Sequence, residues 1–505
     1  MLYLAVVTVL LCAILYCNHG IFTYTLDDPY IHLALAENLM HGHYGINPGE
    51  PSSPSSSIVW PFLLTPTAAA AWNQYLPLAW NVLFCGLAAW LLGRLADRWV
   101  APRASWWTSF AVAASLMLVA NLAGLTFVGM EHGLQVLLAI ACAAGAMEAL
   151  AGRPIPAWCL CAAALGPMVR YENFALVAAL AVALWGQDRL GTPFRLIGAS
   201  LAGPALFSLF LLSRGLPALP TSVLVKAKAY SVTHDGLLVV LHNMYWERDI
   251  GSMRQYAWWA QLVVAALLVY LAWHERQRPR RLVLTGALLA AMLQLAVGRV
   301  NWFNRYEVYA LIFTTLVACT ALFASKRVPR IALIAGLLAI GAPYALACWE
   351  TPIAASNIVQ QQYQMRRFVD DFYRQTVAVN DLGLVSYRRA PGVVILDLWG
   401  LASPEASRTP DKDADWLDTM TRTHSAGLAI VYPDWYEEGA PDDWDPLATM
   451  CITARHISVS RPCVVFYSTA VGDKARLAAE VAEFARTLPP SVRITLGRDT
   501  ADREQ

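Results

Sequence analysis

Residues 106–123 read WWTSFAVAASLMLVANLA and contain no charged side chain. A helix needs about 20 mostly apolar residues to cross the hydrocarbon core of a bilayer, so this run predicts a transmembrane helix. Similar runs recur along the chain, and the shorter ones are expected to be buried among neighbouring helices. We predict about 11 spans, at residues 2–17, 76–93, 106–123, 133–150, 157–169, 174–186, 196–213, 258–273, 282–298, 306–324 and 331–349. The sequence therefore predicts a polytopic α-helical membrane protein.

The composition of the 505-residue chain agrees with this prediction. Hydrophobic residues make up 57% and charged residues 14%, and the mean hydropathy is +0.44, which argues against a water-soluble protein. Until about Glu350, apolar runs alternate with short Arg-rich connectors, whereas after it charged residues spread evenly. We therefore expect a transmembrane domain over residues 1–349 and a soluble domain over residues 350–505. We expect no nucleic-acid partner.

The orientation follows from the charges of the loops. Residues 2–17 have no basic segment before them and no small-residue cleavage site after them, so we interpret them as a retained span. Residues 58–72 form an uncertain apolar run, which we interpret as a juxtamembrane or re-entrant helix. The arginines then gather on one side, which the positive-inside rule makes cytoplasmic, while residues 18–57 contain no Lys or Arg and lie outside. The N-terminus is expected inside and the C-terminal domain outside.

The C-terminal domain has the pattern of a small α/β fold. Strand-like runs at residues 377–379, 393–396, 428–431 and 464–467 alternate with helical patterns, notably at residues 474–487. At about 155 residues it is long enough to bury a core of its own.

Two of the ten cysteines, Cys451 and Cys463, lie in this domain on either side of a strand-like stretch. An oxidising compartment would permit a disulfide between them. The other cysteines lie in or beside apolar runs, where a thiol behaves as a small hydrophobic group.

The first outer loop carries two adjacent carboxylates, Asp27 and Asp28. Asp28 precedes Pro29, and this pair is also a common helix start, which accounts for Asp28 structurally. It does not account for Asp27. Neighbouring carboxylates raise the pKa of each other, as suits a general base or a cation site. Tyr30, His32 and His43 are candidate contacts to substrate, although a surface or interface role is the simpler explanation for His32.

Further polar residues stand at outer span ends and are candidates for substrate binding. Each also has a structural explanation: a buried acid can be paired, Arg170 and Glu172 can pair at a hairpin tip, and cations can contact lipid headgroups. The candidates are Glu131, Arg170, Glu172, Lys226, Lys228, Arg305 and Tyr306. Cations could hold a phosphate leaving group while a carboxylate takes a proton from an acceptor hydroxyl.

At these residues the chain resembles GT-C type glycosyltransferases, closest in pattern to the mycobacterial terminal arabinofuranosyltransferases and their bacterial relatives. The resemblance covers most of the chain in order. It begins with Asp27-Asp28 leading into Tyr30 and a helix, and continues with residues 42–50 and a Ser/Pro-rich stretch ending at Trp60. Later matches are Gly129-Met130-Glu131, Arg170, Leu219-Pro220-Thr221, Arg305-Tyr306, residues 380–383 and residues 397–401.

The resemblance implies a GT-C-like fold with juxtamembrane helices in the first outer loop, residues 18–75. It implies inverting transfer of a sugar from a polyprenyl phosphate to a cell-envelope glycan, lipid or protein at the outer face of a bacterial inner membrane. Asp27 or Asp28 would be the base. Pro29 replaces a more usual small residue, and Pro220-Thr221 lacks an intervening Asn, so the donor sugar stays open.

Two other function classes compete with this hypothesis. A transporter or lipid flippase also has many spans with charged residues, but we find no internal repeat. A scaffold component could bind a glycan without catalysis. No cofactor is required by the pattern, no spacing demands a metal, and a divalent ion stays possible.

Overall fold

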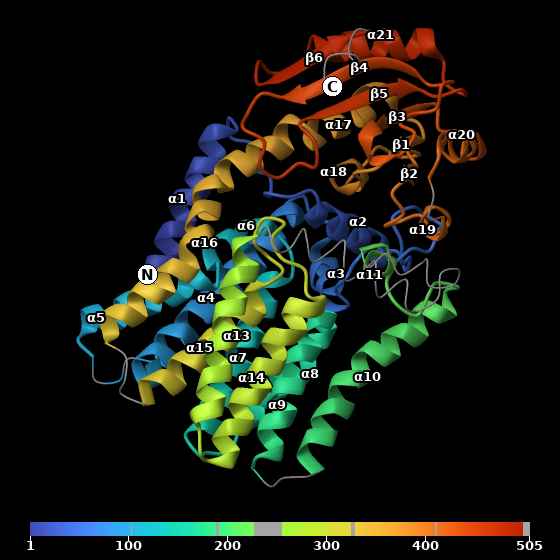
Figure 1. Cartoon of the computed structure of the whole chain (residues 1–505). Helices are drawn as coiled ribbons and strands as arrows, with labels where there is room; N and C mark the ends of the chain where they lie inside the picture. Colours follow the sequence, from blue (N-terminus) through green and yellow to red (C-terminus); the bar gives the residue numbers. More distant parts are fainter. Residues whose placement is uncertain are drawn as a thin grey trace.

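The computed structural model describes residues 1–100, 102, 104–187, 191–226, 255–324, 329–409 and 412–497. A bundle of long helices forms one part and a mixed β-sheet with covering helices forms the other, with the first outer loop between them (Figure 1). The predicted fold class, a polytopic helical protein with a C-terminal α/β domain, is confirmed.

Each predicted span coincides with a helix of the bundle. Seven helices of the described chain are long and apolar enough to cross a membrane, and four shorter apolar helices accompany them. The helices are α1 (Leu2–Cys17), α4 (Leu76–Leu95), α5 (Trp106–Val119), α6 (Leu122–Val128), α7 (His132–Leu150), α8 (Ala157–Val169), α9 (Phe174–Trp185), α10 (Gly191–Ser213), α13 (Tyr256–His274), α14 (Arg278–Val297), α15 (Val308–Ala324) and α16 (Arg330–Gln360).

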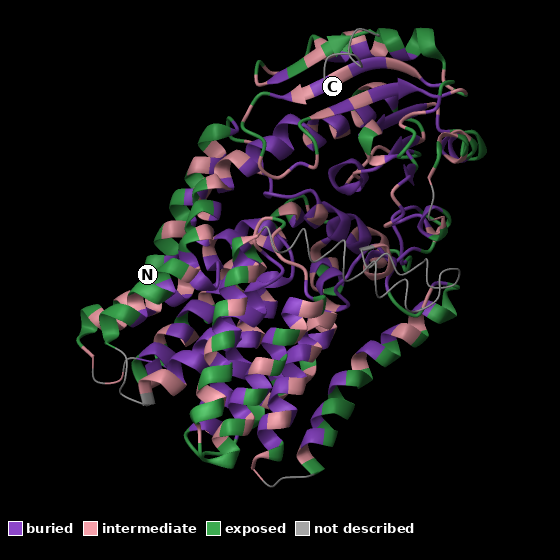
Figure 2. Cartoon of the chain, viewed as in Figure 1, coloured by how far each residue is buried: buried purple, intermediate pink, exposed green. Residues whose placement is uncertain are grey.

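Small residues let the helices of the bundle approach closely. A Cβ on Gly286 of α14 would lie 2.4 Å from the carbonyl oxygen of Ala179 in α9, so the two backbones meet at this glycine. Large apolar side chains such as Phe194 and Leu206 of α10 remain 69% and 68% exposed, and face outward as lipid-contacting residues do. Figure 2 shows this contrast between a buried centre and exposed outer helix faces. The protein is a multi-pass membrane protein.

The first outer loop forms short helices, as expected. Helix α2 (Asp28–Met40) is followed by α3 (Val59–Leu64) and the 3₁₀ turns η1 (Thr65–Thr67) and η2 (Asn73–Tyr75). At about 1.5 Å per residue, α3 is far too short to cross a bilayer of about 30 Å. The run at residues 58–72 is therefore no full span.

The C-terminal sheet has six strands in the order β2-β1-β3-β5-β4-β6. Strand β1 pairs in parallel with β2 and β3, and the remaining pairs are antiparallel. The strands are β1 (Val377–Val379), β2 (Ile395–Asp397), β3 (Leu428–Val431), β4 (Asp445–Ile452), β5 (Cys463–Ser468) and β6 (Val492–Leu496). The covering helices are α17 (Gln362–Arg367), the π-helix η6 (Phe368–Tyr373), α18 (Gly383–Ser386), α19 (Pro404–Arg408), α20 (Ala414–Thr423) and α21 (Lys474–Ala485).

One face of the sheet shares its core with the first outer loop. Because side chains alternate along a strand, Val377 and Val379 face one core and Ala378 the other. The core with Val377 also contains Tyr30 and Trp60 of the first loop. Helix α16 runs through the predicted domain boundary at residues 349 and 350, so the two parts of the chain are joined by a continuous helix.

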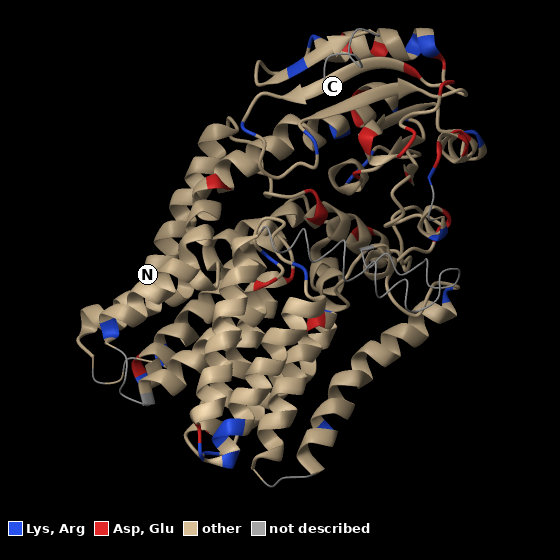
Figure 3. Cartoon of the chain, in the orientation of Figure 1, with Lys and Arg blue, Asp and Glu red and all other residues tan. Residues whose placement is uncertain are grey.

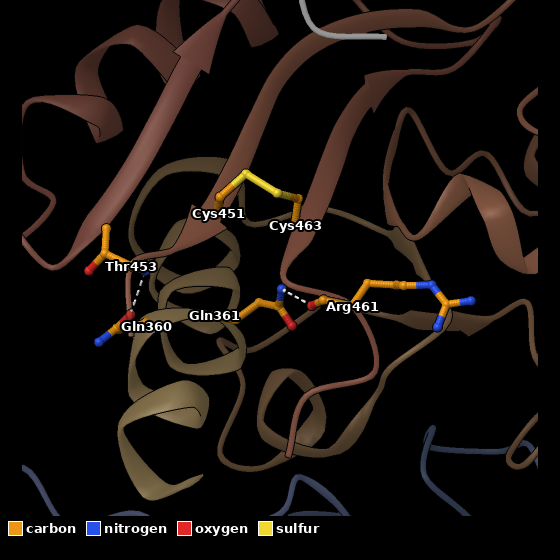
Figure 4. Close-up of a disulfide and its surroundings, with 6 residues drawn as sticks. All are labelled: Gln360, Gln361, Cys451, Thr453, Arg461 and Cys463. Atoms are coloured by element: carbon orange, nitrogen blue, oxygen red, sulfur yellow. Dashed lines mark hydrogen bonds between the residues drawn. A yellow bond between two sulfur atoms is a disulfide. The ribbon is translucent and has the colours of Figure 1, made fainter. Parts of the chain in front are cut away.

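Cys451 and Cys463 face each other on β4 and β5 and form a disulfide (Figure 4). The hairpin between the two cysteines forms hydrogen bonds with the end of α16. Gln360 accepts a hydrogen bond from the backbone N–H of Thr453, and Gln361 donates one to the carbonyl of Arg461. The disulfide thus closes a loop that attaches the sheet to the helix leaving the bundle.

Candidate active site

Backbone contacts hold the first outer loop against the end of the helix bundle. The N–H of Thr25 donates to the carbonyl of Phe127 at 3.0 Å, which places the start of α2 beside the link between α6 and α7. The Ser/Pro run is attached in a similar way, because Ser53 Oγ accepts the N–H of Thr221 at 2.9 Å. Segments that are more than 100 residues apart therefore meet at one place.

Asp28, at the start of α2, pairs with Arg305, which lies just before α15. Arg305 Nη2 is 2.6 Å from Asp28 Oδ2 and 2.8 Å from the hydroxyl of Tyr306, and Nη1 is 2.9 Å from the sulfur of Met130. The Asp28 side chain is 24% exposed and that of Arg305 only 1%. Arg305 Nε is buried and has no hydrogen-bond partner among the described residues. The buried guanidinium of Arg305 thus pairs with the carboxylate of Asp28, which is partly exposed.

A second ion-pair cluster surrounds Arg170, between α8 and the turn η4 (Tyr171–Asn173). Its Nη1 lies 2.8 Å from Glu131 Oε1 and 3.2 Å from Ser56 Oγ, and its Nη2 lies 2.7 Å from Glu172 Oε1. Arg170 and Glu131 are almost fully buried. The structural alternative for Arg170 and Glu172, mutual pairing, is therefore observed, and Glu131 joins the same cluster.

Tyr306 connects the two clusters. The guanidinium carbons of Arg170 and Arg305 lie 5.3 and 4.8 Å from the centre of its ring, within range of a cation–π interaction. His32 extends the network, with Nε2 3.8 Å from Glu131 Oε2. Together the clusters hold three carboxylates against two guanidinium groups, which explains how so many charged groups are buried at one place.

A strained turn at residues 301–304 comes directly before Arg305 and Tyr306. All four residues at positions 301–304 have positive φ, between 51° and 69°. Left-handed backbone costs of order 1 kcal/mol for a non-glycine residue, so other contacts must hold it. The N–H of Asn301 donates to Glu307 at 2.9 Å, and Asn121 donates to the carbonyl of Asn304 at 2.9 Å. Strain of this kind is often found at functional sites.

Asp27 lies apart from this network. It is 6% exposed, and its two carboxylate oxygens accept the backbone N–H groups of Gly383 at 2.6 Å and Leu384 at 2.8 Å, at the start of α18. Burial and the neighbouring carboxyl of Asp381 raise the pKa of Asp27 well above its ordinary value. The two adjacent aspartates therefore have different partners: Asp28 the bundle, Asp27 the C-terminal domain.

Two other predicted residues, Tyr30 and His43, do not join the site. Tyr30 is buried, its hydroxyl accepts the N–H of Tyr24 at 3.3 Å, and its ring packs near that of Tyr387. His43 is exposed in the loop after α2. Lys226 ends helix α11 (Thr221–Lys226), and its side chain, like the whole of Lys228, lies outside the described part of the structure.

The sequence did not single out four residues that complete the site: Ser56, Asn121, Asn301 and Glu307. Ser56 and Glu307 adjoin quoted motifs, but uncharged or isolated residues carry no pattern that would reveal their partners. Within the described residues, no group of three or more His, Cys, Asp or Glu side chains is placed to hold a metal ion.

A small cavity lies beside the Arg170 cluster, between α9, α14 and α15. Its volume is about 190 Å³, and its lining is mostly apolar. It is lined by Tyr171, Glu172, Phe174, Ala175, Leu293, Val297, Gly298 and Tyr309.

One part of the chain matches a known domain family, and most of the chain is similar to two solved structures. A domain family of unknown function (DUF8728) matches residues 356–467, and no curated protein matches the chain. The structure of ArnT from Cupriavidus metallidurans bound to undecaprenyl phosphate is similar over 93% of this chain and 98% of its own, with 11% identity and a TM-score of 0.49. The Archaeoglobus fulgidus oligosaccharyltransferase in complex with Zn and sulfate is similar over 97% of this chain and 74% of its own, with 11% identity and a TM-score of 0.47. These similarities do not show membership of the arabinofuranosyltransferase family that the sequence motifs resemble.

Proposed function

We propose that this protein is a GT-C type membrane glycosyltransferase that moves a sugar from a polyprenyl phosphate to a hydroxyl group of a cell-envelope glycan, lipid or protein. The observation that carries the proposal is the pair of Asp28 and Arg305, a partly exposed carboxylate held by a buried guanidinium at one end of a membrane helix bundle. The family resemblance of the sequence motifs around both residues supports it.

Asp28 is the proposed general base. Its carboxylate would accept the proton of the acceptor hydroxyl while that oxygen forms a bond to the anomeric carbon of the donor sugar. The bond from the anomeric carbon to the phosphate oxygen breaks on the opposite side, and its electron pair leaves with the phosphate. A single displacement of this kind inverts the anomeric configuration. Arg305 holds Asp28 in one orientation at 2.6 Å, which favours a fixed reaction geometry.

The leaving phosphate needs positive charge. Arg305 Nε is a buried donor without a partner among the described residues, and it lies next to the proposed base. Lys226 and Lys228 stay candidates for the same task, since Ser53 anchors the start of α11 beside the first loop. Arg170 is balanced by Glu131 and Glu172, so we assign these three residues to shaping the site around Tyr306.

The apolar cavity beside Glu172 suits the first carbons of a lipid tail. It is lined by residues of the bundle helices, and Tyr309 donates its hydroxyl to the carbonyl of Glu172 at its edge. The charged clusters lie at the same end of the bundle as the first loop, which favours chemistry at one membrane face over transport across the bilayer.

Loop charge supports the proposed orientation. Figure 3 shows Lys and Arg residues at tips of the helices on the side away from the C-terminal domain. By the positive-inside rule these tips are cytoplasmic, so the C-terminal domain lies outside, where a disulfide between Cys451 and Cys463 is stable. We therefore place the protein in a bacterial inner membrane with its site at the outer face.

The test is sugar transfer by the purified protein from a panel of radiolabelled polyprenyl-phosphate sugars, with cell-envelope glycans as acceptors. The wild type should turn over one donor, and Asp28→Asn should lower kcat by about 10²- to 10⁴-fold. Asp443→Asn, at a carboxylate that is 69% exposed in the C-terminal domain, is the matched control and should keep full activity. Parallel assays with a chelator test for a divalent ion. Full activity of Asp28→Asn would contradict the proposed base.

A further inference from the structure

The C-terminal domain reaches the first outer loop directly beside the proposed base. The motif at residues 380–383 follows β1 and leads into α18, whose first two N–H groups donate to the carboxylate of Asp27. Hydrogen bonds from N–H groups to a carboxylate are about twice as strong as neutral ones. Since Asp27 and Asp28 are consecutive residues, the hydrogen bonds that hold Asp27 also restrict the position of Asp28.

The contact is too close for any residue but glycine at position 383. A Cβ there would lie 2.1 Å from the carbonyl oxygen of Asp27 and 2.6 Å from its carboxylate carbon. Distances below 3.0 Å do not occur for real Cβ atoms, and here the first obstacle is backbone, so the chain at Asp27 would have to move. Gly383 does not have positive φ, so its need for glycine comes from this contact alone.

The same segment follows α2 for much of its length. The ring of Tyr387 lies 6.1 Å from that of Tyr30, and the N–H of Arg388 donates to Glu37 at 3.1 Å. Helix α2 is therefore attached to the C-terminal domain near both of its ends, and its start is where Asp28 meets Arg305.

We propose that the C-terminal domain positions the proposed base, with Gly383, Asp381 and Asp27 as positioning residues that set the start of α2 and thereby the place of Asp28. This inference rests on the proposed function, because it needs Asp28 to act on substrate. It gives the C-terminal domain a role in the chemical step besides any role in binding an acceptor.

The contact should also depend on pH. The carboxyl groups of Asp27, which is buried, and Asp381, which is half-buried, are neighbours, and burial raises the pKa of each. Asp381 also accepts hydrogen bonds from Gln362 at 2.7 Å and Tyr432 at 3.3 Å. The other titratable groups that face the pair are Asp28 and Tyr30 of α2, and neither supplies a positive charge.

The sign follows from the raised pKa values. Because their pKa values are raised, Asp27 and Asp381 together keep a proton at pH values where two exposed carboxyl groups would have lost it. The contact between the C-terminal domain and Asp27 is therefore stable while this proton is held, and it weakens as the pH rises through the raised pKa. Both oxygens of Asp27 accept N–H groups, which favours Asp381 as the carrier of the proton. An amide at position 381 would imitate the protonated form at every pH.

The experiment compares kcat, KM and pH profiles of the purified full-length variants. Gly383→Ala should lower kcat by about 10- to 100-fold, as a shift of about 1 Å does elsewhere, with little change in the KM for the lipid donor. Gly336→Ala is the control, because its Cβ meets nothing within 4 Å. Asp27→Asn should behave like Gly383→Ala, since an amide offers only one acceptor oxygen to two donors. Asp381→Asn should move the fall in kcat to a higher pH than in the wild type.

The outcomes separate the two proposals. Wild-type turnover with an inactive Asp28→Asn and an unchanged kcat in Gly383→Ala overturns the positioning role alone. An Asp381→Asn profile that falls at the same pH as the wild-type profile also overturns it, and this measurement does not depend on whether Gly383→Ala folds. A wild type that turns over no donor overturns the proposed function, and the positioning role with it.

Discussion

Asp27 and Asp28 are neighbours in the chain, but their side chains leave α2 about 100° apart, because successive residues of a helix turn by that angle. Asp27 meets N–H groups of the C-terminal domain, and Asp28 meets Arg305 of the bundle. The Pro29 that follows explains why the helix starts here, since proline is favoured in the first turn. One helix start thus carries two carboxylates with separate tasks.

Replacement of Arg305 tests the site at the scale of one residue. Arg305→Lys keeps the charge, but a single ammonium cannot reach Asp28, Tyr306 and Met130 together as the planar guanidinium does. Loss of a charged hydrogen bond costs about 1.5–3 kcal/mol, so kcat/KM should fall by about 10- to 100-fold. Steady-state kinetics with the lipid donor measures this.

The control is Arg422→Lys, at an arginine that is 47% exposed and pairs with Asp418 and Asp443 on the surface of the C-terminal domain. It should leave kcat/KM unchanged. Equal kinetics of Arg305→Lys and the wild type would show that the guanidinium is not needed beside Asp28.

The sequence predicted which charged residues gather at the site better than it predicted their partners. Glu131, Arg170, Arg305 and Asp28 could be found because a charge at the end of an apolar span is unusual. Their pairing could not, because Arg305 and Asp28 are separated by 277 residues and only the fold brings them together. For the same reason, no local pattern could assign Asp27 to Gly383.

At the scale of elements, the places of the spans could be predicted, because the requirement for an apolar run is local. Some of their ends could not: α10 begins at Gly191 rather than residue 196, and α16 continues to Gln360 rather than ending at residue 349. The strands β4 and β6 were not predicted. β4 alternates between buried and partly exposed residues, and β6 is an edge strand with an arginine in it, so neither forms an apolar run. What makes them strands is pairing: β4 pairs with β5 across the hairpin and with β6 further along the chain.

The disulfide on β4 and β5 gives a prediction at this scale. The bonded cysteines are 12 residues apart, and closing a loop of this size stabilises the folded state by about 3 kcal/mol in the chain-entropy model. The double variant Cys451→Ala with Cys463→Ala should therefore unfold at a lower temperature than the wild type. The hairpin at residues 453–462 should also become a site of protease cleavage, because it would lose the covalent bond across its base and keep hydrogen bonds such as those to α16.

Thermal unfolding and limited proteolysis of the protein in detergent measure both effects. Cys161→Ala removes an exposed free thiol and should change neither result. An unchanged unfolding temperature in the double variant would mean that the hairpin is held without the bond.

At the scale of the whole molecule, the two parts of the chain are less independent than their compositions indicate. The shift in charge near Glu350 falls within α16, the helix that connects the bundle to the sheet. The charge pattern does not predict the core shared by Tyr30, Trp60, Val377 and Phe466, because each segment alone has the pattern of an ordinary apolar cluster. The shared core explains how a domain outside the membrane can position a residue at the end of the bundle.

The proposed orientation is the prediction that belongs to the whole chain. If residues 58–72 crossed the bilayer, every later loop would change sides, but α3 has only six residues and cannot do so. Alkaline phosphatase, which is active only outside the cytoplasm, should therefore be inactive when fused after residue 276 and active when fused after residue 505. A fluorescent reporter that matures only in the cytoplasm should give the reverse pattern. Phosphatase activity at residue 276 would place the arginine-rich loops outside, and the Asp28 site would then face the cytoplasm, where a donor would have to be presented on the inner leaflet.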